Sequence, residues 1–206
     1  MASNWKNVVR GVTSGVMLLF VGGVAIHEGL PTDSQGLHPT YTDSAGITTA
    51  CYGETKNITK RYYTTEECKS MLGTSAKDYA SALSGLPPLP TVTYVGALDF
   101  TYNAGKSAFL NSQVRRCLLR SDTECASQAV LQWRFISKTK ITSKDKGYGV
   151  WNWTGKKYTY DCSQLVKGKP NKLCTGLWER RKYQSLMLKG AMSPDEASAL
   201  LQGWYK

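Results

Sequence analysis

"YTDSAGITTACYGET", residues 41–55, is a short segment in which a carboxylate, Asp43, is followed by glycines and a run of hydroxyl side chains. A second carboxylate, Glu28, lies 15 residues upstream (43 − 28 = 15), directly behind a long apolar run. A position behind an apolar helix predicts partial desolvation, which raises a carboxyl pKa as a general acid requires. A turn rich in hydroxyls such as Thr49 instead keeps an acid ionised, which suits a group that holds or activates water.

Two carboxylates in such contrasting environments are typical of glycoside hydrolysis. The same residues also occur in purely structural roles, because aspartates cap turns and polar residues end helices. Both interpretations stay open on these two residues alone.

The composition indicates one basic globular domain. With 206 residues, 41% of them hydrophobic and 11% aromatic, the chain can bury a core and is unlike disordered proteins. The net charge of +11 favours an anionic partner, such as nucleic acid, a membrane surface or a bacterial wall polymer. No recognised nucleic-acid-binding module accompanies the lysines, so nucleic acid is not an expected partner.

Six cysteines occur, an even number, and none has the CxxC spacing of zinc knuckles or thioredoxin-like motifs. Six cysteines allow 15 pairings, and we favour consecutive pairing because it closes three short loops. The alternative is six buried thiols in a cytosolic protein. His27 and His38, the only histidines, have no defined third ligand and predict no metal site. The consecutive pairs are Cys51 and Cys68, Cys117 and Cys125, and Cys162 and Cys174.

The N-terminal segment has the layout of an export signal. Lys6 and Arg10 precede GVTSGVMLLFVGGVAI, residues 11–26, which contains no charged side chain. The run is shorter than a typical transmembrane helix and includes four glycines, so its hold on a membrane would be weak. The alternative is that these residues form a buried first helix of the domain.

The remaining pattern predicts an α+β fold, with a small mixed lobe followed by a mostly helical lobe. Residues 28–63 are rich in glycine, threonine and tyrosine, which indicates loops and short strands. Thr64 and Glu67 form a capping box that opens a helix, and GLPPLP, residues 85–90, ends it. Helical periodicity continues over 93–105, 107–120, 122–136 and 176–190, and Ser193, Pro194 and Glu196 open a last helix.

Residues 136–174 interrupt the helical pattern. Nine lysines against two aspartates give this segment 9 − 2 = +7 of the total charge of +11. Within it, VWNWTGKKYTY, residues 150–160, alternates aromatic and polar residues on both sides of Gly155, which predicts a β-hairpin. The aromatic side chains would either contact sugars or an anionic surface, or pack the hairpin onto the helical lobe.

The residues around the two carboxylates resemble the active-site signature of phage-type lysozymes, the muramidases with which tailed phages lyse their hosts. ALDFTYNAGKSAFLNSQVRRCL, residues 97–118, is similar to the family's helix with a Tyr-Asn-x-Gly motif. GLWERRK, residues 176–182, is similar to its Gly-Leu-x-x-Arg-Arg turn. The signature positions in HEGL and YTDSAGITTACYGET are held by Glu28, Gly29, Tyr41, Asp43, Gly46, Thr49, Tyr52, Gly53 and Thr55.

The resemblance implies a lysozyme-like α+β fold, with a small mixed α/β lobe, a larger helical C-terminal lobe, and the active-site cleft between them. The expected parts are an apolar segment at 1–27, a small lobe carrying the catalytic residues at 28–70, and a helical lobe at 71–206. Residues 136–174 would be a basic, aromatic insertion in the helical lobe, longer than the family's usual connection.

The resemblance also implies roles for single residues. Glu28 would be the general acid, Asp43 the base, and Thr49 a hydroxyl that positions the water. Tyr52 and Asn103 would line the groove that binds the glycan. The expected reaction is hydrolysis of the β-1,4 bond between MurNAc and GlcNAc in peptidoglycan, by a monomer that needs no cofactor.

The sequence departs from the family pattern near the cleft. The spacing between Glu28 and Asp43 is longer than usual, and PTDSQG, residues 31–36, is expected to form an extra loop. Asp33 in this loop is a rival candidate for the base. Cys51 replaces a frequent glycine of the signature, and a disulfide with Cys68 is expected, as in exported members of the family.

Two other functions remain open at this point. A lytic transglycosylase would use Glu28 alone and let a hydroxyl of the substrate attack. A non-catalytic cationic protein would bind the cell wall or a membrane through residues 136–174.

The apolar segment at 11–26 resembles the signal-anchor-release segments of some phage lysozymes. The enzyme would then be tethered to the inner membrane and act in the host periplasm. The alternative location is the host cytoplasm until a holin releases the enzyme.

Overall fold

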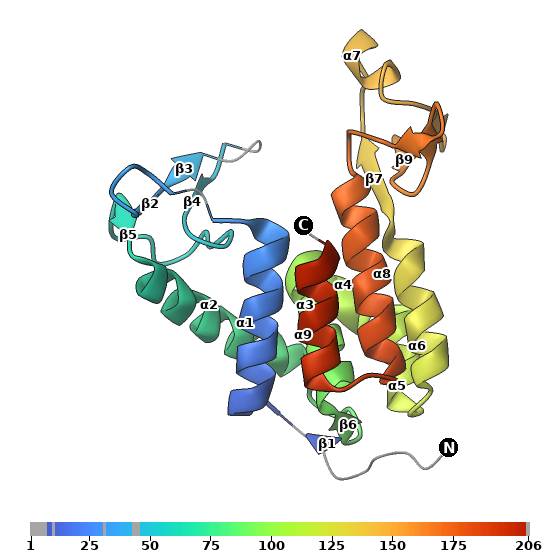
Figure 1. Cartoon of the computed structure of the whole chain (residues 1–206). Coiled ribbons are helices and arrows are strands. Elements are labelled where there is room, and N and C mark those ends of the chain that lie inside the picture. Colours follow the sequence, from blue (N-terminus) through green and yellow to red (C-terminus); the bar gives the residue numbers. More distant parts are fainter. Residues whose placement is uncertain (1–7, 10, 31, 43–45, 205–206) are drawn as a thin grey trace.

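The computed structural model describes residues 8–9, 11–30, 32–42 and 46–204 and has a small lobe joined to a larger helical lobe (Figure 1). The helices are α1 (Ser14–Glu28), α2 (Thr65–Ala80), α3 (Thr91–Ala104), α4 (Lys106–Leu110), α5 (Gln113–Leu119), α6 (Thr123–Val130), α7 (Ser143–Lys146), α8 (Thr175–Lys189) and α9 (Pro194–Trp204), with short 3₁₀ turns at Ser81–Leu83 and Leu131–Trp133.

The strands are short, and three pairings cross intervening strands of the chain: β1 with β6, β2 with β5 and β7 with β9. Four antiparallel pairs form, β1 with β6, β2 with β5, β3 with β4 and β10 with β11, and a three-stranded sheet has the order β7-β9-β8. The strands are β1 (Val8–Val9), β2 (His38–Pro39), β3 (Tyr41–Thr42), β4 (Thr48–Thr49), β5 (Tyr62–Tyr63), β6 (Leu89–Pro90), β7 (Phe135–Lys138), β8 (Trp151–Trp153), β9 (Tyr158–Asp161), β10 (Leu165–Val166) and β11 (Lys169–Pro170).

Helix α3 forms the centre of the helical lobe. All its residues from 92 to 101 are buried, as expected of a helix that is apolar on every side. A Cβ added at Gly96 would lie 2.8 Å from the Met187 Cβ, so α3 and α8 approach more closely than a larger residue would permit. The close packing of α3 against α8 therefore requires a glycine at position 96, three residues before Asp99.

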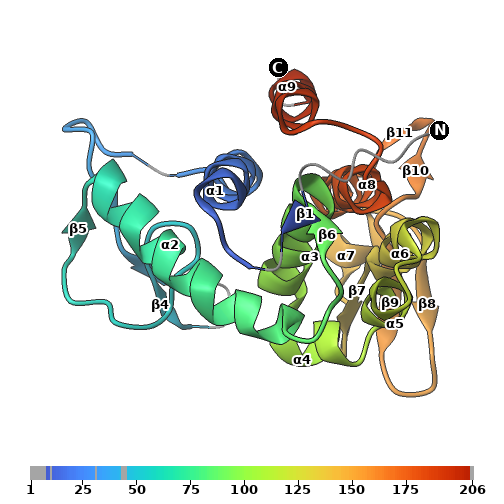
Figure 2. The ribbon, with the colours of Figure 1, turned by 90° about the horizontal axis from the view of Figure 1, so that it is seen from below.

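Helix α1 lies between α2 on one side and α3 and α9 on the other (Figures 1 and 2). It begins where the Thr13 hydroxyl accepts from the Val16 amide, and it ends before Gly29, whose φ of 65° favours glycine. Its inner face buries Phe20 and Val24 completely, whereas Leu18 on the outer face is 78% exposed. In this structure the apolar N-terminal segment is thus the first helix of the core. Among the described residues, no helix combines the length and the apolar character needed to cross a membrane.

The caps of two helices follow the sequence prediction. Thr64 and Glu67 form the predicted capping box of α2, which runs without a break from the small lobe towards the helical lobe. The Ser193 and Glu196 side chains each accept from the backbone amide of the other residue at the start of α9. The single helix predicted over 107–120 is wrong: it divides into α4 and α5, because the Ser112 hydroxyl accepts from the Arg115 amide and starts a new helix.

The cysteines form three disulfides, each between consecutive cysteines of the chain, and none is free. Cys51–Cys68 joins the turn after β4 to α2, and Cys117–Cys125 joins α5 to α6. Cys162–Cys174 closes the segment between β9 and α8. One disulfide thus fixes the small lobe to α2, one joins two packed helices, and one closes the segment that leads into α8.

Residues 136–174, the basic subdomain, project from the helical lobe on the same upper side as β3 and β4 in Figure 1, across the molecule from β4 and β5 in Figure 2. The predicted hairpin forms, with Trp151 opposite Tyr160 and Trp153 opposite Tyr158. The Trp151 indole donates to the Asp145 carbonyl at 2.9 Å, and Tyr160 is completely buried. These two rings therefore pack the hairpin onto α7 of the same subdomain, a third arrangement that the two sequence interpretations did not include.

Candidate functional site

Glu28 is the last residue of α1, and the residue before it anchors this end of the helix. The His27 ring packs edge-on against the Tyr183 ring at 5.3 Å, on α8. Burial lowers the pKa of His27 to about 4. The charge of Asp99 opposes this shift, and the charges of Arg180 and Arg181 add to it. His27 is therefore neutral at neutral pH, and its ring packs α1 against α8. The Glu28 side chain is outside the part of the chain that the structure describes.

Asp43 is also outside the described residues, but the strands on either side of it are described. Thr42 pairs with Thr48, and Tyr41 pairs with Thr49, in the β3–β4 hairpin. This hairpin lies at the same end of the molecule as the C-terminal end of α1 (Figure 1). Gly46 has φ of 81°, a conformation that favours glycine, which accounts for the glycine at this signature position.

Thr49 is only 3% exposed, and its hydroxyl donates to the Ile47 carbonyl at 3.0 Å. With the hydroxyl proton engaged, the oxygen keeps lone pairs that can accept from a water molecule. Thr49 can therefore hold a water as an acceptor, and its own geometry is fixed by the turn.

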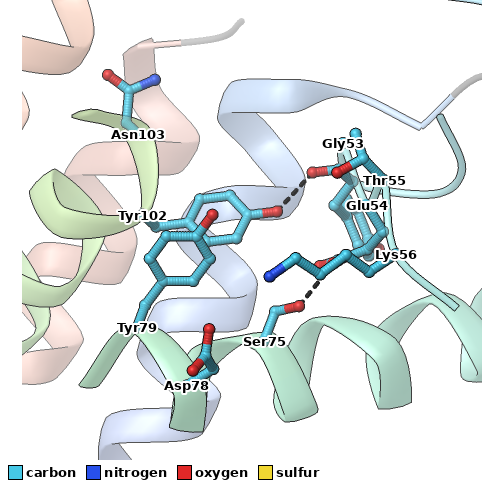
Figure 3. Close-up of a pocket in the computed structure, with 10 residues that line it drawn as sticks. Gly53, Glu54, Thr55, Lys56, Ser75, Asp78, Tyr79, Tyr102 and Asn103 are labelled. Atoms are coloured by element: carbon cyan, nitrogen blue, oxygen red, sulfur yellow. Dashed lines mark hydrogen bonds between the residues drawn. The ribbon is translucent and has the colours of Figure 1, made fainter. Parts of the chain in front are cut away.

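A polar cavity of about 230 Å³ lies between the turn after β4 and helices α2 and α3 (Figure 3). The Tyr102 hydroxyl donates to the Tyr52 carbonyl at 2.6 Å and so joins α3 to the small lobe. Both predicted groove residues, Tyr52 and Asn103, line this cavity, although Tyr52 itself is 3% exposed. The lining residues are Tyr52, Gly53, Glu54, Thr55, Lys56, Ser75, Asp78, Tyr79, Tyr102 and Asn103.

Glu54 is a second glutamate at this site, and it was not among the residues predicted from the sequence. A tight turn holds its backbone against Ala50, and the Ser75 hydroxyl donates to Glu54 Oε2 at 2.6 Å. Burial raises the pKa of Glu54, against the opposing effects of the Ser75 and Tyr102 hydroxyls and of Lys56. Its other oxygen, Oε1, is buried without a hydrogen-bond partner among the described residues. Its place between Gly53 and Thr55 of the signature was the available signal.

A buried polar network supports the far side of the cavity. The Arg181 Nη2 donates to Asn103 Oδ1 at 2.6 Å, and its Nη1 donates to Gln184 at 2.6 Å. The side-chain oxygen of Asn103 is therefore already hydrogen-bonded, which leaves the side-chain NH₂ group to act as a donor towards a ligand. Burial lowers the pKa of Arg181 to about 10, so this guanidinium stays charged at neutral pH.

The network continues to a buried ion pair. Arg180 donates to both oxygens of Asp99, at 2.7 and 3.2 Å, and Gln184 donates to the same carboxylate. Burial alone would raise the pKa of Asp99, but the charge and hydrogen bonds of Arg180 hold this pKa below its ordinary value. The predicted Arg-Arg motif thus packs against α3 and stabilises the junction of α3 and α8.

The structure places the other candidates in structural positions. Asp33 Oδ1 accepts from the Gln35 and Leu37 amides, both at 2.9 Å, and so closes the 31–36 loop. His38 is 4% exposed, with its Nε2 2.9 Å from the Thr65 hydroxyl. Within the described ranges, no group of three or more histidine, cysteine, aspartate or glutamate side chains is arranged to hold a metal ion.

The arrangement of the two lobes around this site is that of a lysozyme-like fold. The chain is similar to an endolysin from the Escherichia coli phage FAHEc1 (TM-score 0.58, 18% identity, covering 87% of this chain and 96% of that one). It is also similar to the muramidase domain of SpmX from Asticaccaulis excentricus (TM-score 0.60, 18% identity, 87% and 98%) and to a variant of P22 lysozyme (TM-score 0.56, 21% identity, 87% and 99%).

Residues 33–145 match the family described as phage lysozyme, and the chain belongs to this family. A relative by sequence, described as the SAR-endolysin of Escherichia phage Mu, is 28% identical over 122 residues, covering 56% of this chain and 71% of that protein. The protein is accordingly a cell-wall-lytic enzyme of the phage endolysin type. The resemblance to phage lysozymes and the lysozyme-like α+β fold class predicted from the sequence are confirmed.

Proposed function

We propose that the protein is a muramidase that hydrolyses the β-1,4 bond between MurNAc and GlcNAc in peptidoglycan and lyses the host at the end of a phage cycle. The observation that carries this proposal is the position of Thr49, buried on β4 beside the Asp43 segment and at the same end of the molecule as the end of α1. Asn103 and Tyr52, which line the neighbouring cavity, support the same location for the substrate.

In the proposed reaction, Glu28 gives its proton to the glycosidic oxygen as the bond to the anomeric carbon breaks. Asp43 takes a proton from a water that attacks this carbon from the opposite face of the sugar. The Thr49 oxygen accepts the other hydrogen of this water, because its own proton is donated to Ile47. The outcome is inversion, which requires carboxyl groups roughly 6.5–9.5 Å apart.

Hydrolysis and transglycosylation would cleave the same bond. Analysis of the products released from purified peptidoglycan distinguishes the two reactions. We expect a reducing MurNAc end from the wild type, seen as a mass gain after borohydride treatment. Asp43→Asn should lower the rate of this reaction by about 10²–10⁴-fold, since the water loses its base. An anhydro-MurNAc product, with activity largely retained in Asp43→Asn, would identify a lytic transglycosylase that uses Glu28 alone.

We also propose that the N-terminal segment tethers the enzyme to the inner membrane, so that the enzyme is in the periplasm before lysis. The enzyme is proposed to be a monomer. The description of the phage Mu relative as a SAR-endolysin supports this proposal. In the folded enzyme α1 packs against α2, α3 and α9, and it cannot do so while it lies in a lipid bilayer. The tethered form would therefore lack its first helix and would be inactive. Retention in the cytoplasm until a holin acts is the alternative.

Leu18→Lys separates these two locations. Leu18 is 78% exposed in the folded enzyme, so the variant should fold and degrade purified peptidoglycan normally. In a bilayer a central lysine costs about 2.5–3.5 kcal/mol, which a weak apolar segment cannot offset. Without holin, wild type should appear in the membrane fraction and be released by an uncoupler, whereas Leu18→Lys should not be membrane-bound. Leu18→Ser, which introduces no charge at the same position, is the matched control. Wild-type protein that stays in the cytosol would contradict the tether.

A further inference from the structure

The turn between β8 and β9, residues 153–158, is an ordered tip that carries aromatic and basic side chains. We call it the hairpin tip. The Thr154 amide and hydroxyl both donate to the Lys157 carbonyl at 2.9 Å, and Gly155 has the φ of 85° that this turn requires. The Trp153 and Tyr158 rings pack together with centroids 4.8 Å apart, and Trp153 is nevertheless 55% exposed. The tip thus holds a large apolar surface in solvent on a fixed scaffold.

The charge of the basic subdomain is not neutralised within the folded protein. Asp145 pairs with Lys138 at 2.6 Å, and Asp161 pairs with Arg134 at 3.1 Å, so both acids of the subdomain already have partners. The other lysines are exposed, and none forms a salt bridge with a described residue. They are Lys140, Lys144, Lys146, Lys156, Lys157, Lys167, Lys169 and Lys172.

An exposed tryptophan beside unpaired lysines is the combination that binds a lipid interface. Indole and phenol rings favour the headgroup level of a membrane, and lysines favour anionic leaflets. The Trp153 and Tyr158 rings contact each other at an angle of 49°, and more than half of the Trp153 surface stays in solvent. We propose that the hairpin tip is an anchoring site for anionic lipid phosphates, with Trp153 at the interface and Lys156 and Lys157 on the headgroups.

The tip belongs to a part of the molecule that is separate from the small lobe. Figure 2 places the basic subdomain across the molecule from β4 and β5, and in Figure 1 it projects on the same side as the β3–β4 hairpin. The inference does not depend on the reaction proposed above, because it concerns binding to lipid in the absence of peptidoglycan.

Sedimentation with vesicles tests the inference on the purified full-length protein. We expect binding to phosphatidylglycerol-containing vesicles and at least tenfold weaker binding to pure phosphatidylcholine. Lys156→Gln/Lys157→Gln should weaken the first by about 30-fold, since each lysine near an anionic leaflet contributes roughly fivefold. Trp153→Ala should also weaken it. Because these side chains are exposed or touch only the tip, thermal unfolding should be unchanged.

The matched control removes two lysines from α2, in Lys69→Gln/Lys77→Gln, and should weaken binding less than threefold. Equal losses in both double variants would mean that only net charge matters and would overturn the proposal. Loss of binding to purified, lipid-free peptidoglycan in the tip variants, with vesicle binding intact, would overturn it in favour of a glycan site. Peptidoglycan cleavage should be the same in the tip variants and wild type, whichever reaction the enzyme performs.

Discussion

Glu28→Gln is expected to lower the rate of turbidity loss of chloroform-treated Gram-negative cells by about 10²–10⁴-fold, because glutamine cannot protonate the leaving oxygen. The substitution keeps the size of the side chain at the end of α1, and His27 still anchors that end through Tyr183. Binding to cell walls and thermal unfolding should therefore resemble those of wild type. Lysis lost with wall binding retained also excludes a purely non-catalytic binder.

The control for this variant is Glu54→Gln. Glu54 is the other glutamate of the site, and its raised pKa is a property that a general acid also needs. Its Oε2, however, is bonded to Ser75, and its Oε1 is buried, so neither oxygen is presented to a substrate. We expect Glu54→Gln to retain lysis within severalfold of wild type. A dead Glu54→Gln beside an active Glu28→Gln would transfer the acid role to Glu54.

Asp99→Asn is expected to cost about 3–5 kcal/mol of unfolding free energy, because it leaves the buried Arg180 guanidinium without its counter-charge. Asp99 and Arg180 are 3% and 5% exposed, so water cannot replace the lost partner. In a chain of this length the loss corresponds to a melting temperature lower by about 10 °C. Denaturant and thermal unfolding at pH 7 measure it.

A surface ion pair provides the comparison for this prediction. Asp78 pairs with Lys106 at 2.8 Å, but its side chain is 56% exposed. Asp78→Asn should therefore change stability by less than about 1 kcal/mol. If Asp99→Asn lowered stability as little as Asp78→Asn, the buried Arg180 guanidinium would not need Asp99 as its counter-charge. The buried network would then not be what holds α3 against α8.

Local signals in the sequence account for the elements that were predicted correctly. Thr64 and Glu67 cap α2 within one turn, and Gly155 reverses the β8–β9 hairpin, so each element is fixed by neighbours in the chain. The break between α4 and α5 was missed because helical periodicity continues through Ser112, whose capping bond outweighs it. The motif resemblance supplied the fold class, which periodicity alone could only describe as α+β.

The site was predictable only where a motif marks it. Thr49 and Asn103 belong to recognised motifs, and so do Arg180 and Arg181, but the pairing of these arginines with Asp99 and Asn103 spans 81 and 78 residues and is not marked in either motif. Glu54 becomes noticeable only when folding buries it against Ser75, 21 residues away. Burial and such distant contacts depend on the whole packing of the chain, which no local pattern contains.

The backbone enters and leaves the β7–β9 sheet at almost the same point, since the Cys162 amide donates to the Arg134 carbonyl at 3.0 Å. Residues 135–161 therefore leave the helical lobe after α6 and return to it before α8 at this hydrogen bond. The length of this segment can therefore vary without moving either helix. An engineered enzyme in which a short turn joins residues 134 and 162 should keep its catalytic framework, which makes this appendage a replaceable module for changing where the enzyme accumulates.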